Sequence, residues 1–503
     1  VSIGNKVTSG LLVTMFWVVI LTVTSVLLFW LHWRWRHRRM LELAASVPGP
    51  FAWPLVGNCL TFMSDGGKRQ LEKISQLTSK YGDYLRFWLG PDLNICVKNP
   101  ADIRLLLTSN KVNQKGPVYD FMKKFIGPGI LTGGPTWRHH RKVATPAYNK
   151  KCVNNFADIF NVEAFYLTEA LSKKTSTPFD VYYDVVKTTT QCVCQTLMGL
   201  SKDDSLNLCQ LDKVVADTPS YYTLIFNKMT RWWLQIPLVY WWTGGMEKER
   251  RCVKDIDYLT SDILRKRRQS LEKHGVPDEE TMGIVDRFIL SGEMTDQEIK
   301  WETFSLFTTS QEAAAKITSG MILFLAHLPE WQTKVYNEIV RVVGLEGPVS
   351  PEELKQLDYL DMVYKETLRY WSIAAMIQRT VEEEVTINNG TITLPVGTSL
   401  VIPIHDLHRD PRYWEEPNKV KPERFLPENM KGRDSNAFVP FSLGAMDCLG
   451  RVYATALIKT LVVQLLRRLQ FEGEGSLDDL QLDVAISVRS ATGYMVRVKP
   501  RSL

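Results

Sequence analysis

An uncharged apolar run near the start of the sequence most limits how this chain can fold. Residues 11–33 read LLVTMFWVVILTVTSVLLFWLHW and contain no Asp, Glu, Lys or Arg. About 20 apolar residues in a helix cross a bilayer, although a buried core helix gives a similar pattern. The next six residues, RWRHRR, are typical of a segment that stays on the cytosolic side. We therefore predict a retained transmembrane anchor over residues 11–33, with a short lumenal N-terminus at residues 1–10.

A proline-rich segment separates this anchor from the rest of the chain. The sequence VPGPFAWPLVGN, residues 47–58, has three prolines within seven residues. Proline fixes φ and lacks a backbone donor, so we expect residues 34–58 to form a basic block followed by a stiff hinge. No second linker, repeat or low-complexity tract follows. We therefore predict one large domain over residues 59–503.

The composition excludes some classes of function. A net charge of +6 over 503 residues is small and dispersed, and no nucleic-acid recognition motif occurs. A basic surface for an acidic protein partner or an anionic membrane fits better. The eight cysteines include no C-x-x-C pair, which argues against a structural zinc or iron–sulfur site. Such sparse cysteines suit reduced thiols in a cytosol-facing domain.

Most of the domain has helical patterns. Thr295 and Glu298 form a capping box, and a helical pattern then continues to His327. This helix would be roughly 48 Å long, enough to cross a whole domain. Asn388-Asn389-Gly390 indicates a hairpin. Strand patterns are short and occur at Tyr84–Leu89, Asn94–Val97, Val385–Ile392 and Ser399–Ile402. We predict a mainly α fold with a minor β part.

A lone cysteine near the C-terminus carries the first functional signal. Cys448 lies between Gly444 and Gly450 and immediately precedes a helical pattern. A helix N-terminus favours thiolate, and the two glycines would let the backbone pass close to a flat, bulky group. One thiolate in such a loop suits an axial ligand of haem iron. A packed core cysteine is the simpler alternative. A nucleophile paired with His405 or His408 is another, although the spacing does not support it.

Three further motifs point to a bound acidic cofactor. Glu366 and Arg369, in KETLR, lie three residues apart on one helical face. Arg424, in PERF, offers a second guanidinium. Trp137 and Arg141, in WRHHR, lie on one face of another helix, where they could meet an acidic group. Each motif is common alone, but their order and spacing are not.

Together these motifs resemble the cytochromes P-450, the haem-thiolate monooxygenases. The family's cysteine-loop pattern F-x-x-G-x-R-x-C-x-G is matched at Phe441, Gly444, Cys448 and Gly450. Its E-x-x-R and P-E-R-F segments and its H-R-D-P…W run are matched too. The anchor and hinge resemble those of microsomal members. WRHHRKVATPAY and LAHLPEWQTKVYNEI are most similar to the animal branch that contains fatty-acid ω-hydroxylases and many insect enzymes.

The resemblance implies a cytochrome P-450 fold behind the transmembrane helix, in the endoplasmic reticulum membrane, with the catalytic domain cytosolic. It implies haem b as cofactor, with Cys448 as the iron ligand. The other implied cofactor contacts are Trp137, Arg141, Arg379, Phe441, Gly444 and Gly450. A structural network is implied for Glu366, Arg369 and Arg424. The substrate pocket would contain Tyr119, Phe121, Phe125, Ala313, Ala374 and Ile377.

The sequence departs from the family pattern at two places. Met446 stands where the cysteine loop normally carries an arginine that pairs with a haem propionate. We expect Arg141 and Arg379 to hold the carboxylates instead, with haem bound less tightly. In the central helix the acid remains as Glu312, but the family's threonine is Ala313. Proton delivery then falls to Glu312, Ser310 or Thr309 acting through water, and without it turnover would release peroxide.

Three functions are compatible with these features. The first is a membrane-bound monooxygenase that acts on a lipophilic substrate with electrons from NADPH through a partner reductase. Its basic face for that partner would include Lys142, Lys150, Lys151, Lys431, Arg433 and Arg451. The second is a haem-thiolate isomerase or dehydratase that needs no oxygen, as Ala313 suggests. The third is a catalytically degraded haem- or lipophile-binding protein. Eight aromatic residues between Tyr221 and Trp242 suggest a segment near the membrane interface.

Overall fold

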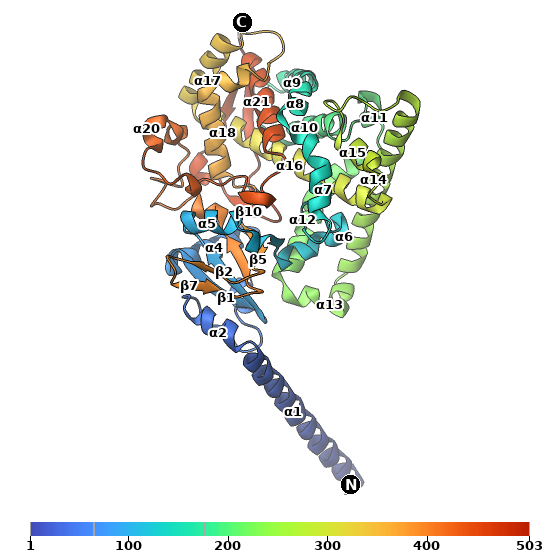
Figure 1. Ribbon diagram of the computed structural model, residues 1–503, viewed down its shortest axis with the longest axis vertical. Helices are drawn as coiled ribbons and strands as arrows, with labels where there is room; N and C mark the ends of the chain where they lie inside the picture. Colours follow the sequence, from blue (N-terminus) through green and yellow to red (C-terminus); the bar gives the residue numbers. More distant parts are fainter. Residues whose placement is uncertain (1, 64–65, 176, 502–503) are drawn as a thin grey trace.

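The computed structural model describes residues 2–63, 66–175 and 177–501. Helix α1 (Ser2–Arg36) leaves the body of the molecule as a single rod, and the short helix α2 (Arg38–Ala45) follows it (Figure 1). The stretch Thr14–Arg36 has a mean hydropathy of 2.2 and no residue of its most apolar window is buried in the protein. One helix is therefore long and apolar enough to cross a membrane.

The proline-rich segment is fixed to the body of the protein. The Arg86 N–H of strand β1 (Tyr84–Leu89) donates to the Pro48 carbonyl at 2.8 Å. The side-chain oxygen of the buried Asn58 accepts from the Trp88 N–H at 2.9 Å, and the Asn58 N–H donates back to the Trp88 carbonyl at 2.6 Å. Residues 47–58 thus lie against β1, which orients the chain that leads to α1.

A five-stranded sheet brings distant parts of the chain together. Its strand order is β1-β2-β8-β5-β3, where only the β2–β8 pair is parallel. Besides β1, the sheet contains β2 (Asp92–Val97), β8 (Ser399–Ile402), β5 (Ile377–Thr380) and β3 (Gln114–Lys115). The smaller sheets contain β4 (Phe179–Asp180), β12 (Met495–Pro500) and β9 (Leu469–Gly473), β10 (Leu482–Val484) and β11 (Val488–Ser490), and β6 (Val385–Ile387) and β7 (Ile392–Leu394).

The strand predictions hold, with two adjustments. β1 and β8 have the predicted bounds, and β2 begins two residues earlier than expected. The run at residues 385–392 is the predicted hairpin rather than one strand, because Asn388 and Asn389 adopt left-handed φ values of 53° and 52°. Strands β3, β5 and those after residue 468 were not predicted from the sequence.

The long central helix is present as predicted. Helix α16 (Asp296–His327) starts from a complete capping box, in which the Glu298 N–H donates to Thr295 Oγ1 at 3.3 Å and the Thr295 N–H donates to Glu298 Oε2 at 2.8 Å. α16 contacts α10 (Tyr182–Thr196), α18 (Asp358–Tyr370) and α21 (Arg451–Arg468), and lies within the main hydrophobic core. Figure 1 shows it passing through the centre of the helical part.

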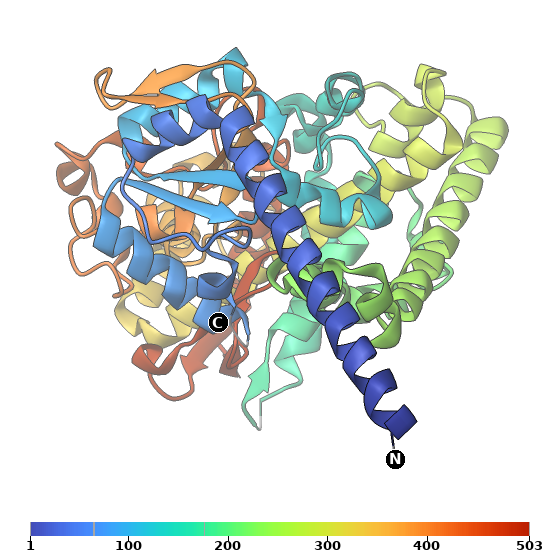
Figure 2. The same ribbon diagram turned by 90° about the horizontal axis from the view of Figure 1, so that it is seen from below.

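The other helices surround α16 or cover the sheet. A second hydrophobic cluster lies between α5 (Pro100–Thr108) and the sheet, so the core has a helical part and a sheet part. Figures 1 and 2 show α1 leaving the end of the molecule where the sheet lies. The remaining longer helices are α4 (Gly67–Tyr81), α7 (Trp137–Ala144), α8 (Lys150–Asn155), α9 (Ala157–Ser172), α12 (Leu211–Thr230), α13 (Pro237–Trp242), α14 (Gly245–His274), α15 (Ile284–Ser291) and α17 (Pro329–Val342). The fold is mainly α with minor strand content, as predicted.

Candidate functional site

The cysteine loop is a closed turn in front of α21. The Cys448 N–H donates to the Phe441 carbonyl at 2.8 Å, which joins the two ends of the loop. Arg451, the first residue of α21, lies with its guanidinium 5.7 Å from the centre of the Phe441 ring. The helix predicted after Cys448 is therefore present and fixes the direction of the loop.

The two glycines of the loop have different reasons to be glycine. Gly444 has a φ of +77°, and a Cβ there would lie 1.9 Å from the Leu107 carbonyl oxygen of α5. A Cβ at Gly450 would find its nearest neighbours at ordinary distances, 3.8 Å from Tyr148 Cε1 and 4.0 Å from Cys448 Sγ. Packing against α5 therefore requires a glycine at position 444, and the expected place of both glycines beside a bulky group stays a prediction.

The cysteine of this loop combines solvent exposure with close protein surroundings. Protein surrounds the thiol, yet the residue is accessible to solvent. Burial raises the pKa of Cys448, whereas the Gly450 N–H, Arg141 and Lys115 act to lower it. The backbone N–H at the start of α21 thus acts to lower the thiol pKa, as expected, but desolvation is the larger effect. A coordinated metal ion would deprotonate such a thiol directly.

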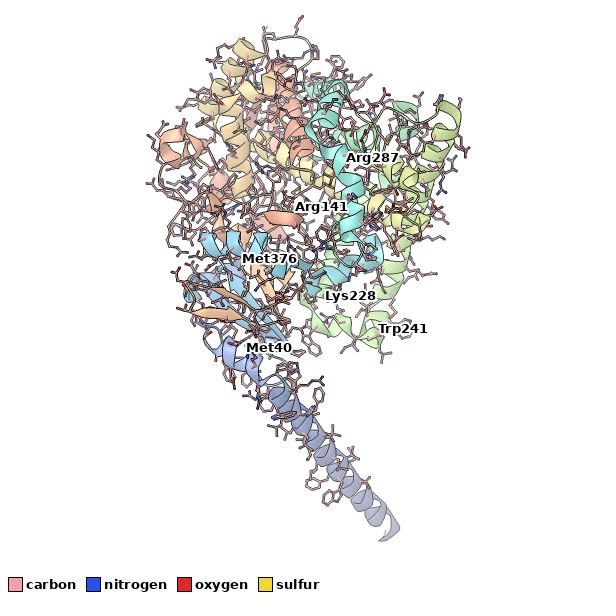
Figure 3. All side chains as sticks on the ribbon, viewed as in Figure 1. Met40, Arg141, Lys228, Trp241, Arg287 and Met376 are labelled. Carbon is pink, nitrogen blue, oxygen red and sulfur yellow. The ribbon has the colours of Figure 1, made fainter. Side chains whose placement is uncertain are left out.

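Basic side chains converge beside the cysteine. Arg141 donates to the Asp447 carbonyl at 2.8 Å and to its carboxylate at 2.5 Å. Arg379 is 2% exposed and donates to the Met446 carbonyl at 3.3 Å. Figure 3 shows Arg141 in the interior of the view, between the helical part and the sheet. The structure thus joins two of the predicted cofactor residues through the backbone of the cysteine loop.

Lys115 lies with Arg141 and Arg379 in one group of basic residues, here called the cation cluster. The sequence patterns did not predict this position. Strand pairing sets Lys115 opposite Arg379. Burial, followed by the charges of Arg379 and Arg141, lowers the pKa of Lys115 well below its usual value. Among the described residues neither Lys115 nor Arg379 forms an ion pair with a carboxylate. This excess of positive charge suits an acidic ligand such as the two propionates of haem.

Met446 and Trp137 occupy apolar positions at this site. Met446 is 7% exposed, so the residue that replaces the family's arginine fills space. Trp137 is buried in α7, where the Arg138 guanidinium lies 5.5 Å from the centre of its ring. The residues present, a thiol, a cluster of cations and apolar side chains, fit a haem group.

One strip of α16 is open within an otherwise buried stretch. Between Glu302 and Ala326 every residue is buried except Thr309, Ser310 and Ala313. These three, called the open strip below, share one helical face. The Tyr148 hydroxyl lies 3.5 Å from Ser310 Oγ, and the edge of its ring lies close to Gly450. Tyr148 therefore connects the cysteine loop with the open strip.

The proton donors expected from the sequence are not equivalent in the structure. Thr309 Oγ1 donates to the Ser305 carbonyl at 2.7 Å, within its own helix. Glu312 is 4% exposed, lies outside the open strip and pairs with Lys316 at 2.5 Å. Ser310 and Ala313 share the strip with Thr309.

The predicted structural network is complete and fully buried. Arg369 Nε and Nη2 donate to the two carboxylate oxygens of Glu366 at 2.7 and 2.8 Å, and both side chains are 0% exposed. Arg424 Nε lies 3.4 Å from Glu366 Oε1. Arg369 also donates to the His408 and Pro417 carbonyls at 2.9 and 2.8 Å. This network fixes α18 to the segment that precedes the cysteine loop.

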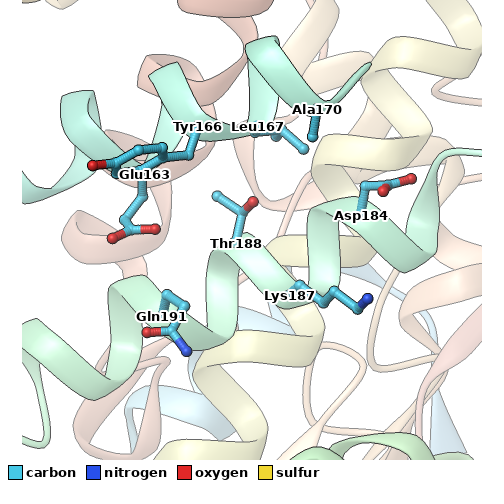
Figure 4. A pocket seen from close by; sticks show the side chains of 8 residues that line it. All are labelled: Glu163, Tyr166, Leu167, Ala170, Asp184, Lys187, Thr188 and Gln191. Carbon is cyan, nitrogen blue, oxygen red and sulfur yellow. The ribbon is translucent and has the colours of Figure 1, made fainter. Parts of the chain in front are cut away.

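The predicted pocket residues come from two clusters. Tyr119 and Phe125 are buried in the helical core, with Phe121 packed against it. Ala374 and Ile377 belong to the sheet cluster instead. The contacts therefore do not place all the predicted residues around one space. A separate surface hollow lies between α9 and α10 (Figure 4) and shares no residue with this site; it is lined by Glu163, Tyr166, Leu167, Ala170, Asp184, Lys187, Thr188 and Gln191.

The histidines considered as partners of a nucleophilic cysteine are engaged elsewhere. His408 Nδ1 lies 3.0 Å from Ser372 Oγ, and its Nε2 accepts from the Val439 N–H at 3.0 Å. His405 Nδ1 lies 3.1 Å from Arg409 Nη1. These contacts orient neither ring toward Cys448, so the geometry does not favour a cysteine–histidine pair.

A lone thiol beside cations, in a loop that Tyr148 connects with a long central helix, is typical of the haem-thiolate class of protein. The family model described as "Cytochrome P450" matches residues 47–496, and the chain belongs to this family. Relatives include human "Cytochrome P450 4V2", 27% identical over 93% of this chain and 91% of the relative. "Cytochrome P450 4d10" of Drosophila mettleri is 28% identical over 96% and 98%. "Cytochrome P450 4c3" of Drosophila melanogaster is 25% identical over 96% and 95%. The chain is thus a cytochrome P-450 monooxygenase, an oxidoreductase similar to animal and insect members.

Proposed function

We propose that this protein inserts one oxygen atom from O2 into a lipophilic substrate, with electrons from NADPH delivered through a partner reductase. The observation that best supports this function is Cys448, a solvent-accessible cysteine near Arg141 and Lys115. Haem, when bound, supplies the iron chemistry of oxygen activation. Cys448 would be the iron ligand, and Gly450 leaves room beside it.

The other residues of the site would hold and surround the cofactor. Arg141, Arg379 and Lys115 would bind its carboxylates, and Trp137 and Phe441 would add apolar contacts. Arg141 now forms an ion pair with the Asp447 carboxylate. To bind a carboxylate of the cofactor, Arg141 would give up part of this contact. An apolar substrate would meet Tyr119, Phe121 and Phe125, aromatic residues that belong to the helical core or pack against it.

The experiment that tests the haem-thiolate assignment is the carbon monoxide difference spectrum of the dithionite-reduced protein. We expect the red-shifted Soret band typical of thiolate ligation. Cys448→Ser should abolish this band, whereas Cys209→Ser, at an exposed free cysteine, should keep it. Folded wild-type protein without the band would overturn the proposal and favour a binding role.

A haem-thiolate isomerase or dehydratase is the second candidate. It is favoured by Ala313, which places a side chain without a hydroxyl in the open strip. NADPH consumption that rises with substrate and gives oxygenated product would support the monooxygenase. Turnover of a lipid peroxide without NADPH would support the isomerase.

We propose the endoplasmic reticulum membrane as the location, with the catalytic domain on the cytosolic side. Helix α1 supports an anchor, and Trp241 lies at the same end of the molecule as Met40 of α2 (Figure 3). Tyr221 and Tyr240 of the aromatic segment are buried core residues, whereas Trp241 and Trp242 are exposed.

The basic face proposed for the reductase is reduced by internal contacts. Lys151 pairs with Glu280, and Arg433 lies 4.3 Å from the centre of the Trp414 ring. Arg451 lies over the Phe441 ring, as described above. Lys142, Lys150 and Lys431 are therefore the better candidates for contacts with an acidic partner.

A further inference from the structure

A buried ion pair holds the carboxylate of α16. Lys316 Nζ lies 2.5 Å from Glu312 Oε1, and the two side chains are 5% and 6% exposed. Lys316 also donates to Ser487 Oγ at 2.5 Å, and that hydroxyl lies 3.3 and 3.4 Å from the Glu312 oxygens. Ser487 is in the turn between β10 and β11. Glu312 is therefore bound both from its own helix and from this hairpin.

These contacts remove Glu312 from the open strip. A carboxylate that moved toward the strip would leave the Lys316 ammonium buried without its partner, which is strongly unfavourable. Glu312 also lies on a buried face of α16, whereas Thr309, Ser310 and Ala313 form the open one. The acid that the sequence offers as a proton donor is thus held away from the place where a donor is needed.

Ser310 is the hydroxyl of the open strip with a partner outside α16. Its Oγ lies 3.5 Å from the Tyr148 hydroxyl, whereas Thr309 donates to its own helix. Tyr148 is 4% exposed, and burial raises the pKa of its phenol, so this O–H remains a donor at neutral pH. When Tyr148 donates to Ser310 Oγ, the Ser310 hydrogen is free to point along the open strip.

We propose that Ser310, oriented by Tyr148, passes solvent protons during oxygen activation, and that Lys316 keeps Glu312 out of this relay. The inference rests on the proposed monooxygenase function. In one turnover two electrons from NADPH and two solvent protons convert one oxygen atom to water while the other enters the substrate. Ser310 gives up its proton and takes one back from water, so it is unchanged at the end. Tyr148 is a positioning residue.

The first test compares Tyr148→Phe and Ser310→Ala with Tyr364→Phe. Tyr364 is a matched control, because it is buried and its hydroxyl lies 3.0 Å from Thr455 Oγ1 of α21 rather than beside a hydroxyl of the open strip. We expect Tyr148→Phe and Ser310→Ala to keep the thiolate band but to release several-fold more peroxide per NADPH. The double variant should release no more peroxide per NADPH than either single variant. An unchanged peroxide ratio would overturn the inference.

A stability cycle gives a readout that does not depend on turnover. The unfolding midpoints of Tyr148→Phe, Ser310→Ala and the double variant should be non-additive if the two hydroxyls interact. Additive midpoints, together with peroxide ratios like that of Tyr364→Phe, would show that Tyr148 does not act through Ser310.

The second test separates Glu312 from the relay. Glu312→Gln and Lys316→Met should each lower the thermal midpoint, because each leaves one buried charge unpaired. The variant with both changes should regain most of the midpoint and keep the wild-type peroxide ratio. A stable double variant that releases as much peroxide as Tyr148→Phe would overturn the inference, since Glu312 would then be a donor. Absence of the thiolate band in the folded wild-type protein would instead overturn the proposed function.

Discussion

The side chain of Arg369 is fully buried, with the equally buried Glu366 as its counter-charge. Removing that carboxylate leaves a buried guanidinium unpaired, which costs roughly 3–5 kcal/mol. We predict that Glu366→Ala lowers the free energy of unfolding by about this amount in urea titration. Glu352→Ala, which breaks the exposed pair with Lys355, should change it little. Equal losses for the two variants would contradict the assignment.

His408 should make stability depend on pH. Burial and the neighbouring Arg369 and Arg409 lower the pKa of His408 to about 3. The unfolded residue has a pKa of about 6.5, so between these values the unfolded state binds the extra proton. Stability therefore falls as pH decreases through 6.5, by about 1.4 kcal/mol for each full unit. We predict that His408→Gln flattens the pH dependence of the unfolding midpoint between pH 7 and 5. An equal slope in both proteins would show that His408 is not the group responsible.

The resemblance to the P-450 family pointed to Cys448, the Glu366–Arg369 pair and Arg141, because each belongs to a short motif whose members are near in sequence. Lys115 and Tyr148 could not be found in this way. Lys115 reaches Arg379 through a two-residue strand, and Tyr148 reaches Ser310 across 162 residues. Lys316 was accessible to sequence reasoning, since it stands four residues after Glu312 on the same helix.

At the scale of elements, the cysteine loop depends on its contact with α5. Gly444→Ala would combine a positive φ with a Cβ only 1.9 Å from the Leu107 carbonyl. We predict that this variant loses haem and unfolds at a lower temperature. Gly450→Ala, whose Cβ meets the protein only at ordinary distances, should keep the unfolding midpoint close to that of the wild type. Thermal unfolding compares the two variants, and equal losses in the midpoint would contradict the prediction.

Elements with a local signal were predicted well. The capping box and the unbroken helical pattern of α16, and the Asn-Asn-Gly turn between β6 and β7, are written in neighbouring residues. Strand β3 has two residues, and β5 reads IQRT without the apolar run that marks the equally short β8 (SLVI); both exist because the sheet supplies partners far along the chain. For the same reason the sequence did not reveal Lys115, the residue of β3 that lies beside Arg379 and Arg141.

At the scale of the whole molecule, helices α1 and α13 lie at the same end (Figure 1). Leu238, Trp241 and Trp242 are 72%, 63% and 81% exposed. Tryptophan favours the membrane interface, so we predict that a protein without residues 1–36 still binds lipid vesicles in part. Changing Trp241 and Trp242 to Ser in that truncated protein should release it, whereas Tyr183→Ser, at another exposed aromatic residue, should not. Sedimentation with vesicles measures this, and full release by truncation alone would contradict it.

The large P450 domain and an N-terminal helix apolar enough to cross a membrane could be predicted from the sequence, because both depend on bulk properties, the apolar run and the absence of a later linker. The arrangement of the two core clusters could not, since it depends on which distant strands and helices meet. The placement of Ala374 and Ile377 in the sheet cluster follows from that arrangement.

The order of α1 and Cys448 along the chain has a consequence for biosynthesis. More than 400 residues separate the apolar helix from the thiol. At about 5–20 residues per second, a ribosome makes the helix roughly 20–80 s before it makes the cysteine. Arg424 and α21, which complete the buried network and the loop, also come from this last part of the chain. With the membrane location proposed above, the nascent protein is tethered long before it can capture its cofactor, and we expect haem insertion to be a late event beside the bilayer.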